Sequence, residues 1–439
     1  MNKLTHKITA MFAKDQWMYS EGKWVFLVKI INIGLTFLTS VVLARTLGTR
    51  NFGIFTQVLA IISVVGAPTE IGLPQLMVRE TARLVENRDW AKINGFWRWS
   101  VSIIIGTSVL FIIGYPLVRP FLGKLISEDL HEPLVWGMLL VPLFGVLAIL
   151  SSGIRGFHRI AIAQVAEQVL LPGLFIGFLI VATTQIGYQV TPLLAILLQV
   201  GASFLSLGFG LFILFRIAPG EILKASPVYD RIEWLKSTLS LASISGMQIL
   251  NKWLSLIIVG IFVKYAELGI YRVGIQIAIL ADFGRLILYP LLSSQISKYY
   301  AKNDMVHLQY LARLSARWII LINSAIYVLF FFFGKYFVNF FYGKEYKTAY
   351  TIVLILIAGQ VVDSITGASS LFLTMTGFER DTAKIRFFTT TMNLVMIYVF
   401  SDLWGIVGAA VATAVSLIVW NVMIWFLVKK KLGINCLPI

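Results

Sequence analysis

Residues 43–55 read Leu43-Ala44-Arg45-Thr46-Leu47-Gly48-Thr49-Arg50-Asn51-Phe52-Gly53-Ile54-Phe55 and connect two apolar runs, roughly 24–44 and 53–77. A related element, Leu268-Gly269-Ile270-Tyr271, begins 216 residues after Phe52 and aligns with Phe52-Gly53-Ile54-Phe55. With the same shift, Pro74 meets Pro290. Matches that keep their order at a nearly constant offset predict an internal repeat.

The repeat continues through the rest of both halves with shifts of 219 to 221. The further matches are Arg98-Trp99 with Arg317-Trp318, Leu122-Gly123-Lys124 with Tyr342-Gly343-Lys344, and Gly156-Phe157-His158-Arg159 with Gly377-Phe378-Glu379-Arg380. We therefore expect an amino-terminal lobe over 1–215, a linker over 216–236 and a carboxy-terminal lobe over 237–439. Two copies inserted with the same orientation predict a pseudo-two-fold axis along the membrane normal.

Composition places most of this surface in lipid. Hydrophobic residues make up 58% of the 439 residues, charged residues 13%, and the mean hydropathy is +0.84. A soluble domain of this length requires more polar surface, so this class is excluded. Because only a helix satisfies its own backbone in hydrocarbon, each apolar run of about 20 residues predicts a spanning helix.

The sequence predicts an all-α polytopic membrane protein with about twelve spanning helices, six in each lobe. The runs are 24–44, 53–77, 99–118, 134–153, 161–183, 191–215, 237–263, 269–292, 318–334, 349–373, 387–401 and 405–428. An even number of crossings places both termini on one side. The segment 1–23 is too polar for a signal-peptide core, so we expect the first span to be an uncleaved anchor.

Basic residues predict which side that is. With both termini cytoplasmic, including the segments 1–23 and 429–439, about two-thirds of the 37 Lys and Arg residues fall in inside segments. Topology and anionic headgroups account for the net charge of +16 without nucleic-acid binding. Cys436 is the single cysteine, so no intrachain disulfide can form.

Polar residues recur at equivalent places in the first and seventh spans. Lys29, Asn32, Thr36 and Thr39 share one helix face, and Ser245, Gln248, Lys252 and Ser255 stand 216 residues later. A charge at the bilayer centre costs roughly 2.5–3.5 kcal/mol on insertion scales. Two such faces in equivalent places predict a water-accessible central cavity, with a buried interhelical network and snorkelling as the alternatives.

Further intramembrane charges are weaker signals. Asp282 and Arg285 stand three residues apart, so they either neutralise one another or line the cavity. Asp363 has no partner on its own span and is a candidate for ion coupling. Glu167, before Pro172, and Glu70, between Pro68 and Pro74, occur where proline removes a helical hydrogen bond, so they mark either ion sites or structural bends.

Motifs for chemistry are missing from the sequence. No G-x-x-x-x-G-K-[ST] motif occurs, so ATP hydrolysis is not expected, and no D-x-D pair occurs to hold a metal-bound nucleotide sugar. The four histidines, His6, His131, His158 and His307, lack ligand spacing. We therefore expect no catalytic residues, no metal and no cofactor, which leaves transport as the prediction.

Residues 43–55 resemble the signature of bacterial polysaccharide exporters, in which an L-G-x-x-x-[FY]-G run follows the first span. Glu70-Ile71-Gly72-Leu73-Pro74, Val78-Arg79-Glu80 and the second element around Leu268 continue the resemblance. It covers nearly the whole chain. The chain is similar to the oligosaccharide flippase branch of the multidrug/oligosaccharidyl-lipid/polysaccharide exporter superfamily.

The resemblance implies translocation of an undecaprenyl-diphosphate-linked oligosaccharide from the inner to the outer leaflet of a bacterial plasma membrane. This translocation would proceed by alternating access and would serve the assembly of surface polysaccharide or O-antigen. An anionic diphosphate suits cationic and polar cavity residues: Lys29, Asn32, Thr36, Gln248, Lys252, Arg285 and Arg45. Asp363, Asp282, Glu70 or Glu167 would couple transport to H⁺ or Na⁺. Glycan polymerases or ligases and membrane lipids are the implied partners.

Other functions stay open. The related multidrug exporters should favour acidic cavity residues, whereas both polar faces here carry lysine, namely Lys29 and Lys252. A membrane-embedded glycan transferase requires an acid–base constellation that the sequence does not offer. A scaffold without transport activity leaves the paired lysines unexplained.

Overall fold

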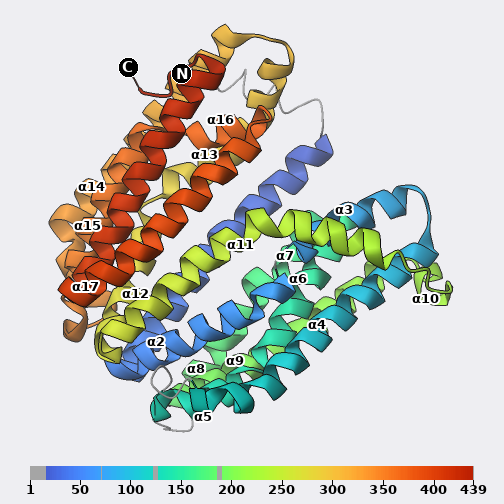
Figure 1. The fold of residues 1–439 in the computed structure, drawn as a ribbon, viewed down its shortest axis with the longest axis horizontal. Coiled ribbons are helices and arrows are strands. Elements are labelled where there is room, and N and C mark those ends of the chain that lie inside the picture. Colours follow the sequence, from blue (N-terminus) through green and yellow to red (C-terminus); the bar gives the residue numbers. More distant parts are fainter. Residues whose placement is uncertain (1–15, 71, 122–126, 185–189, 439) are drawn as a thin grey trace. The chain divides into compact units, whose positions relative to one another are not determined.

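The computed structural model describes residues 16–70, 72–121, 127–184 and 190–438, and within them every regular element is a helix (Figure 1). The helices of the first half are α2 (Gln16–Glu70), α3 (Leu73–Glu86), α4 (Trp90–Val118), η1 (Arg119–Phe121), α5 (Glu128–Gly137), α6 (Leu140–Gly156), α7 (Ile160–Val165), η2 (Ala166–Leu170), α8 (Leu171–Thr184) and α9 (Pro192–Ile217). The second half contains α10 (Glu221–Lys224), α11 (Arg231–Phe262), α12 (Tyr265–Leu280), α13 (Phe283–Ala301), α14 (Met305–Phe341), η3 (Lys344–Tyr346), α15 (Ala349–Ile365), α16 (Ser369–Met375) and α17 (Glu379–Leu432).

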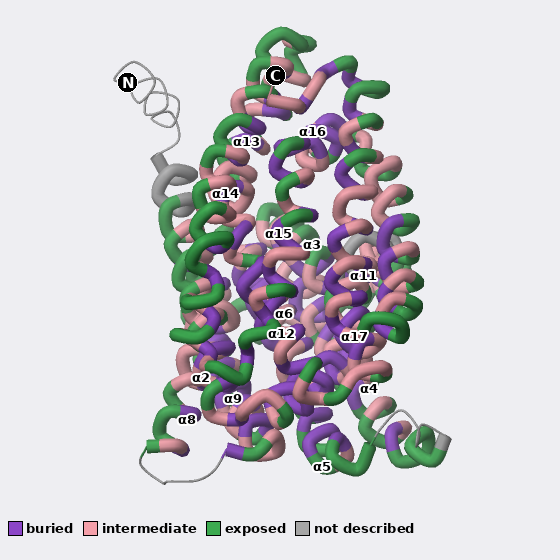
Figure 2. The backbone as a smooth tube through the Cα atoms, turned by 90° about the vertical axis from the view of Figure 1, so that its left-hand side faces the viewer, coloured by how far each residue is buried: buried purple, intermediate pink, exposed green. Residues whose placement is uncertain are grey.

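The described helices confirm an all-helical multi-pass membrane protein. Seven of them are long and apolar enough to cross a bilayer, or nine if two bent pairs each count as one span. Many residues of α14 are exposed (Figure 2). They include Phe332, Tyr336 and Phe340, whose large side chains suit contact with lipid. The number of twelve crossings and the cytoplasmic side of both termini stay predictions.

Two of these helices are too long to be single spans. Helix α2 has 55 residues and α17 has 54, whereas about 20 residues cross a hydrocarbon core. Each contains a break, at Gly48 in α2 and at Trp404–Gly405 in α17, and each covers two of the predicted apolar runs.

The ends of α17 lie side by side. The Nζ atom of Lys431 lies 3.3 Å from the carboxylate of Asp381, and the hydroxyl of Ser416 donates to the carbonyl of Thr389 at 2.9 Å. Residues 50 positions apart can meet in this way because the helix turns back at Gly405, whose φ is +57°. Helix α17 is therefore an antiparallel helical hairpin.

Two other spans are broken helices. Helices α12 and α13 meet at an angle of 46°, and α15 and α16 meet at 51°. The first break falls at Ala281–Asp282 and the second at Thr366–Ala368, where Gly367 has a φ of +62°. A broken helix leaves main-chain N–H and C=O groups without helical partners, and these groups require polar side chains nearby.

The chain forms two compact units. The first contains residues 1–42 and 62–246, and the second contains 43–61 and 247–439. The first unit has a core around Leu76, Phe96, Trp99 and Trp234, to which the start of α11 contributes. The second unit therefore includes residues 43–61 from the amino-terminal half of the chain. The boundaries of the units differ from the predicted lobe boundaries at 215 and 237, which stay a prediction.

The predicted linker is folded against the first unit. Residues 216–236 include the end of α9, the short α10 and the start of α11. The side chain of Asn94 donates to the carbonyl of Ala225 at 2.7 Å, and the Val228 N–H donates to Ala91 at 3.1 Å. A Cβ atom on Gly95 would lie 1.9 Å from the Val228 carbonyl oxygen, so this close approach requires glycine.

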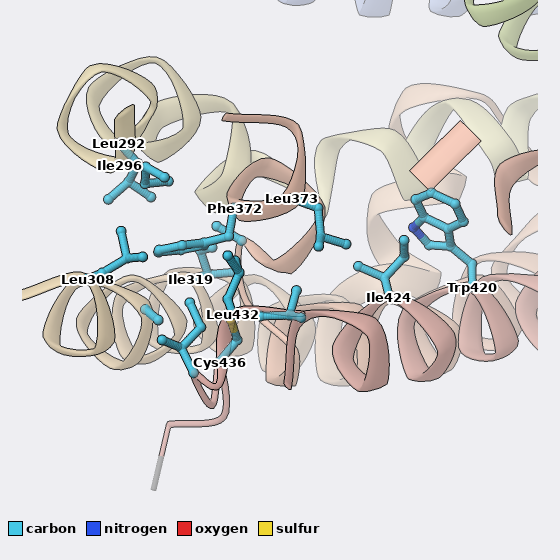
Figure 3. Close-up of a cluster of buried hydrophobic side chains, with 14 residues drawn as sticks. Leu292, Ile296, Leu308, Ile319, Phe372, Leu373, Trp420, Ile424, Leu432 and Cys436 are labelled. Atoms are coloured by element: carbon cyan, nitrogen blue, oxygen red, sulfur yellow. The ribbon is translucent and has the colours of Figure 1, made fainter. Parts of the chain in front are cut away.

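The carboxy-terminal residues of the chain pack into the core of the second unit. Side chains from α13, α14, α16 and α17 form a buried cluster that includes Leu292, Ile319, Phe372 and Ile424, together with Cys436 (Figure 3). The amide of Gln309 exchanges two hydrogen bonds of 2.7 Å with the main chain of Asn435. Burial in this cluster raises the pKa of the Cys436 thiol to about 11, so the thiol is unreactive at neutral pH.

The glycines of the repeated element allow a close main-chain approach in the second unit. A Cβ atom on Gly53 would lie 1.7 Å from the carbonyl oxygen of Tyr265, and one on Gly269 would lie 2.4 Å from that of Thr49. Tyr265 and Gly269 stand 216 residues after Thr49 and Gly53, so the two contacts are equivalent in the repeat. Reciprocal contacts of this kind are characteristic of a two-fold axis.

Replacing Gly53 or Gly269 by alanine should therefore destabilise the protein by about 1–3 kcal/mol, because each added methyl group meets main-chain atoms that cannot rotate away. Thermal unfolding of the detergent-solubilised protein measures the change. Gly34→Ala is the matched control, since nothing lies within 4 Å of a Cβ atom at that helical position. Equal melting temperatures for Gly34→Ala and Gly53→Ala would contradict the close crossing.

Candidate functional site

The polar face of α2 lies in the first unit. Lys29 and Asn32 are half-buried, and Thr36 is exposed. The Asn32 side-chain amide donates to the carbonyl of Gln168 in η2 at 2.7 Å, and the Thr39 hydroxyl donates to Leu35 of its own helix. The face therefore combines a half-buried lysine with a side-chain contact to a neighbouring helix.

The equivalent face of α11 lies in the second unit. Lys252 is exposed, with its Nζ atom 4.6 Å from the centre of the Trp253 ring, and the Arg272 guanidinium lies 5.5 Å from the same ring. Gln248 and Ser245 have side chains outside the described residues. A shared wet space for Lys29 and Lys252 stays a prediction, because the lysines belong to different units.

An asparagine pair adds to the α11 face. The Asn393 amide of α17 donates to the side-chain oxygen of Asn251 at 2.9 Å. Neither asparagine is among the predicted site residues. Asn393 lies inside the run 387–401, where an amide in an apolar setting was the available signal.

Arg45 contacts the main chain of α14 in the second unit. Its Nε atom donates to the Phe341 carbonyl at 2.7 Å, and its Nη2 atom contacts the Phe340 carbonyl. The Tyr346 hydroxyl donates to the Ala44 carbonyl at 3.1 Å. Carbonyls at a helix carboxyl end lack helical donors, and a cation is favourable there. The geometry therefore gives Arg45 a structural role at this helix end, and cargo binding by Arg45 stays a prediction.

The strongest cluster of charges lies at the two helix breaks of the second unit. The Arg285 guanidinium makes two hydrogen bonds of 2.6 Å to the Asp282 carboxylate and also forms an ion pair with Asp363. Asp363 comes from α15 and is 2% exposed. The sequence showed the Asp282–Arg285 spacing, but the pairing with Asp363 depends on tertiary packing of α13 against α15. The three groups carry a net charge of −1.

Arg386 adds a second cation near this cluster. Its guanidinium lies 3.5 Å from the centre of the Trp420 ring and within electrostatic range of Asp363 and Arg285. Arg386 precedes the predicted run 387–401, and the structure places it within α17. With Arg386 included, two carboxylates face two guanidinium groups, so the cluster is close to neutral.

Neutral polar side chains hold the broken helix ends around the cluster. Asn323 of α14 is fully buried, accepts from the Gly284 N–H at 2.9 Å and donates to Ser364 at 2.9 Å. The Tyr327 hydroxyl lies 2.9 Å from the Ser364 hydroxyl, and the Gln360 amide donates to the Ala278 carbonyl at 2.8 Å. These residues satisfy main-chain groups that the breaks release.

Asn421 of α17 completes this polar shell. Its side-chain oxygen accepts from the Thr366 hydroxyl at 3.2 Å, at the α15–α16 break. Asn323, Tyr327, Ser364 and Asn421 are uncharged, so the pattern of intramembrane charges did not predict them. Their occurrence within long apolar segments was the signal that could have identified them.

The remaining carboxylates lie in the first unit. Glu167 is in the π-helical turn η2. Its carboxylate interacts electrostatically with Arg155 and lies near the Ser151 hydroxyl of α6. Arg155 also donates to Ser152 at 2.8 Å. The side chain of Glu70 lies outside the described residues. Among the described residues, no group of three His, Cys, Asp or Glu side chains is arranged to hold a metal ion.

Long apolar helices, broken spans and intramembrane charges define a multi-pass membrane protein of the transporter type. A sequence model of the family described as "Polysaccharide biosynthesis protein" matches residues 21–282, which is more than half of the chain. The chain belongs to this family, which confirms the resemblance found in the sequence.

Known proteins agree with this assignment. The chain is 22% identical over 419 residues to the probable low-salt glycan biosynthesis flippase Agl15 of Haloferax volcanii, and the match covers 91% of this chain and 81% of that protein. Two solved structures share the fold at 14% identity. One is a multidrug resistance MATE family transporter of the MOP superfamily in an inward-facing conformation, with a TM-score of 0.74 and coverage of 91% and 94%. The other is the lipid II flippase MurJ in an inward closed conformation, with 0.73 and coverage of 92% and 87%.

The Arg285 cluster allows a direct energetic test. Arg285→Met should destabilise the protein by about 3–5 kcal/mol, because it leaves a buried carboxylate without its cation. Adding Asp363→Asn to that variant should recover part of the loss. Thermal unfolding measures both changes, with Lys384→Ala as a control, because Lys384 lies 3.9 Å from Asp381 and is 81% exposed. A double variant no more stable than Arg285→Met would show that Asp363 does not depend on Arg285.

Proposed function

We propose that this protein flips a lipid-linked oligosaccharide, with undecaprenyl diphosphate as the carrier, from the inner to the outer leaflet of a plasma membrane. The family, the glycan flippase relative and the fold shared with a lipid II flippase support this class of cargo. The single observation that carries the proposal is that each of the two equivalent polar helix faces contains one lysine, Lys29 in the first and Lys252 in the second. The relative is archaeal, so the proposed bacterial inner membrane and O-antigen role rest on the sequence resemblance.

The proposal assigns cargo binding to the lysine-bearing faces, with Thr36 and Gln248 beside the lysines. A diphosphate is anionic, and a cation in a low-dielectric setting binds it strongly. Arg45 and Arg285 are less suited to this role, because Arg45 is bound to main-chain carbonyls and Arg285 is bound by two carboxylates. Glycan polymerases or ligases would act on the flipped product.

Multidrug export is the second candidate, since one similar structure is a multidrug transporter. Cationic drugs require carboxylates where they bind. The exposed charge on the α11 face is Lys252, and Asp363 is 2% exposed and paired with Arg285. The placement of charge therefore favours an anionic cargo.

Lys29→Ala combined with Lys252→Ala should lower surface glycan at least ten-fold and cause lipid-linked oligosaccharide to accumulate on the inside. The reason is that the diphosphate loses both counter-charges. Surface glycan is measured by labelling of intact cells, and lipid-linked oligosaccharide by extraction, at matched protein levels. Lys430→Ala in the exposed tail is the control. Normal surface glycan in the double variant would reject the anion site.

Coupling to H⁺ or Na⁺ is proposed to involve Asp363, with Asp282, Glu70 and Glu167 as the further candidates. A buried carboxylate that shares one guanidinium with a second carboxylate changes its interactions when it binds a cation or proton. Asp363→Asn should remove the dependence of transport on outside pH or sodium in proteoliposomes while the protein still folds. Unchanged ion dependence in Asp363→Asn would remove this residue from the mechanism.

A further inference from the structure

The turn η2 in the first unit contains a carbonyl group that has lost its normal helical donor. In an α-helix, the N–H of residue 172 would donate to the carbonyl of residue 168. Residue 172 is proline, which has no N–H. Immediately before it, the Leu171 N–H donates to Ala166, five residues earlier, so the helix widens into a π turn.

Asn32 of α2 supplies a donor to this carbonyl. Its side-chain amide donates to the Gln168 oxygen at 2.7 Å, across 136 residues of sequence. Because an unpaired carbonyl in the membrane interior costs free energy, the hydrogen bond at this position is worth more than one on a solvated surface. The proline on one helix and the asparagine on the other therefore form one complementary pair.

The contact is important because α2 is sparsely packed in this region. Among the described residues 23–39, Val28 alone is buried. A Cβ atom on Gly34 would meet nothing within 4 Å. Few other contacts therefore fix the rotation of this helix about its axis. Lys29 precedes Asn32 by three residues and Thr36 follows it by four, so both share its face.

We propose that Asn32 is a positioning residue that fixes the polar face of α2, and with it Lys29, by binding the main-chain carbonyl released by Pro172. Asn32 then acts on transport through the orientation of Lys29, and its amide does not bind the cargo. The inference rests on the proposed function for the role of Lys29, but the hydrogen bond itself is independent of what the protein transports.

A double-mutant cycle in a labelling experiment tests the pairing without transport. Thr36→Cys places an exposed thiol on the same face, and the native Cys436 is fully buried and reacts slowly. The reaction rate with a water-soluble maleimide reports the orientation of α2 in proteoliposomes. Asn32→Ala should change this rate by about two- to ten-fold, which corresponds to the loss of one hydrogen bond.

Pro172→Ala provides the decisive background, because alanine restores an N–H that can donate to Gln168 within the helix. In that background, Asn32→Ala should change the labelling rate by less than about two-fold. An equal effect of Asn32→Ala in both backgrounds would overturn the proposal, since Asn32 would then act independently of the carbonyl. Asn32→Leu is a second variant that keeps a similar volume but has no donor, and it should match Asn32→Ala.

The control is Thr183→Ala on α8, whose hydroxyl is bonded to Leu179 of its own helix, and it should leave labelling unchanged in both backgrounds. Glycan export by the same variants gives the second readout. Export should fall with Asn32→Ala and recover in part when Pro172→Ala is added, whereas a cargo ligand would show no recovery. Failure of the labelling cycle rejects the pairing, and failure of the lysine variants to affect export rejects the proposed cargo site.

Discussion

The main-chain crossing at Gly53 and Gly269 is the constraint on which the architecture of the second unit depends. The main chains of two helices are in direct contact, which requires a residue without a Cβ atom at both positions. The contacts are related by the 216-residue shift of the repeat, so both copies must keep the same small residue. The segment 43–61 is thereby packed within the unit that otherwise contains 247–439. The glycines of the sequence signature thus have a packing role.

The second general feature is the use of polar side chains to satisfy broken helices. Asn323, Gln360 and Thr366 serve the two breaks in the second unit, and Arg45 serves the carboxyl end of α14. Each contact fulfils a hydrogen bond that lipid cannot supply. The breaks bring Asp282 and Asp363 to opposite sides of Arg285, so backbone discontinuity and the charged cluster have a common origin. Helix breaks at ion sites are a recurrent feature of transporters.

Local patterns predicted much of this protein. Hydropathy gave the helical membrane class, and the repeat gave the glycine pair, because both signals depend on residues near in sequence or on simple spacing. The break at Gly48 falls between the predicted runs 24–44 and 53–77, and the break at Trp404–Gly405 falls where the run 405–428 begins. The pairing of Asp363 with Arg285 could not be predicted, since the two residues are 78 positions apart and are joined by packing of α13 with α15. Arg45 and Asn32 were predicted to line a cavity, and in the structure each donates to a main-chain carbonyl. Sequence patterns do not show which carbonyls lack a helical donor.

Main-chain and side-chain demands also explain how charge is distributed. Arg45 is bound to helix-end carbonyls, and Arg285 is shared by two carboxylates. A cation that stabilises the fold is poorly suited to release and recapture an anion in every cycle, because each release would leave a buried acceptor without its donor. Lys252 is exposed and lies beside the Trp253 ring. A lysine on a flexible stem can exchange an aromatic ring for a phosphate at small cost. Arg45 and Arg285 thus stabilise helix ends and breaks, and Lys29 and Lys252 stay the predicted residues for binding the cargo.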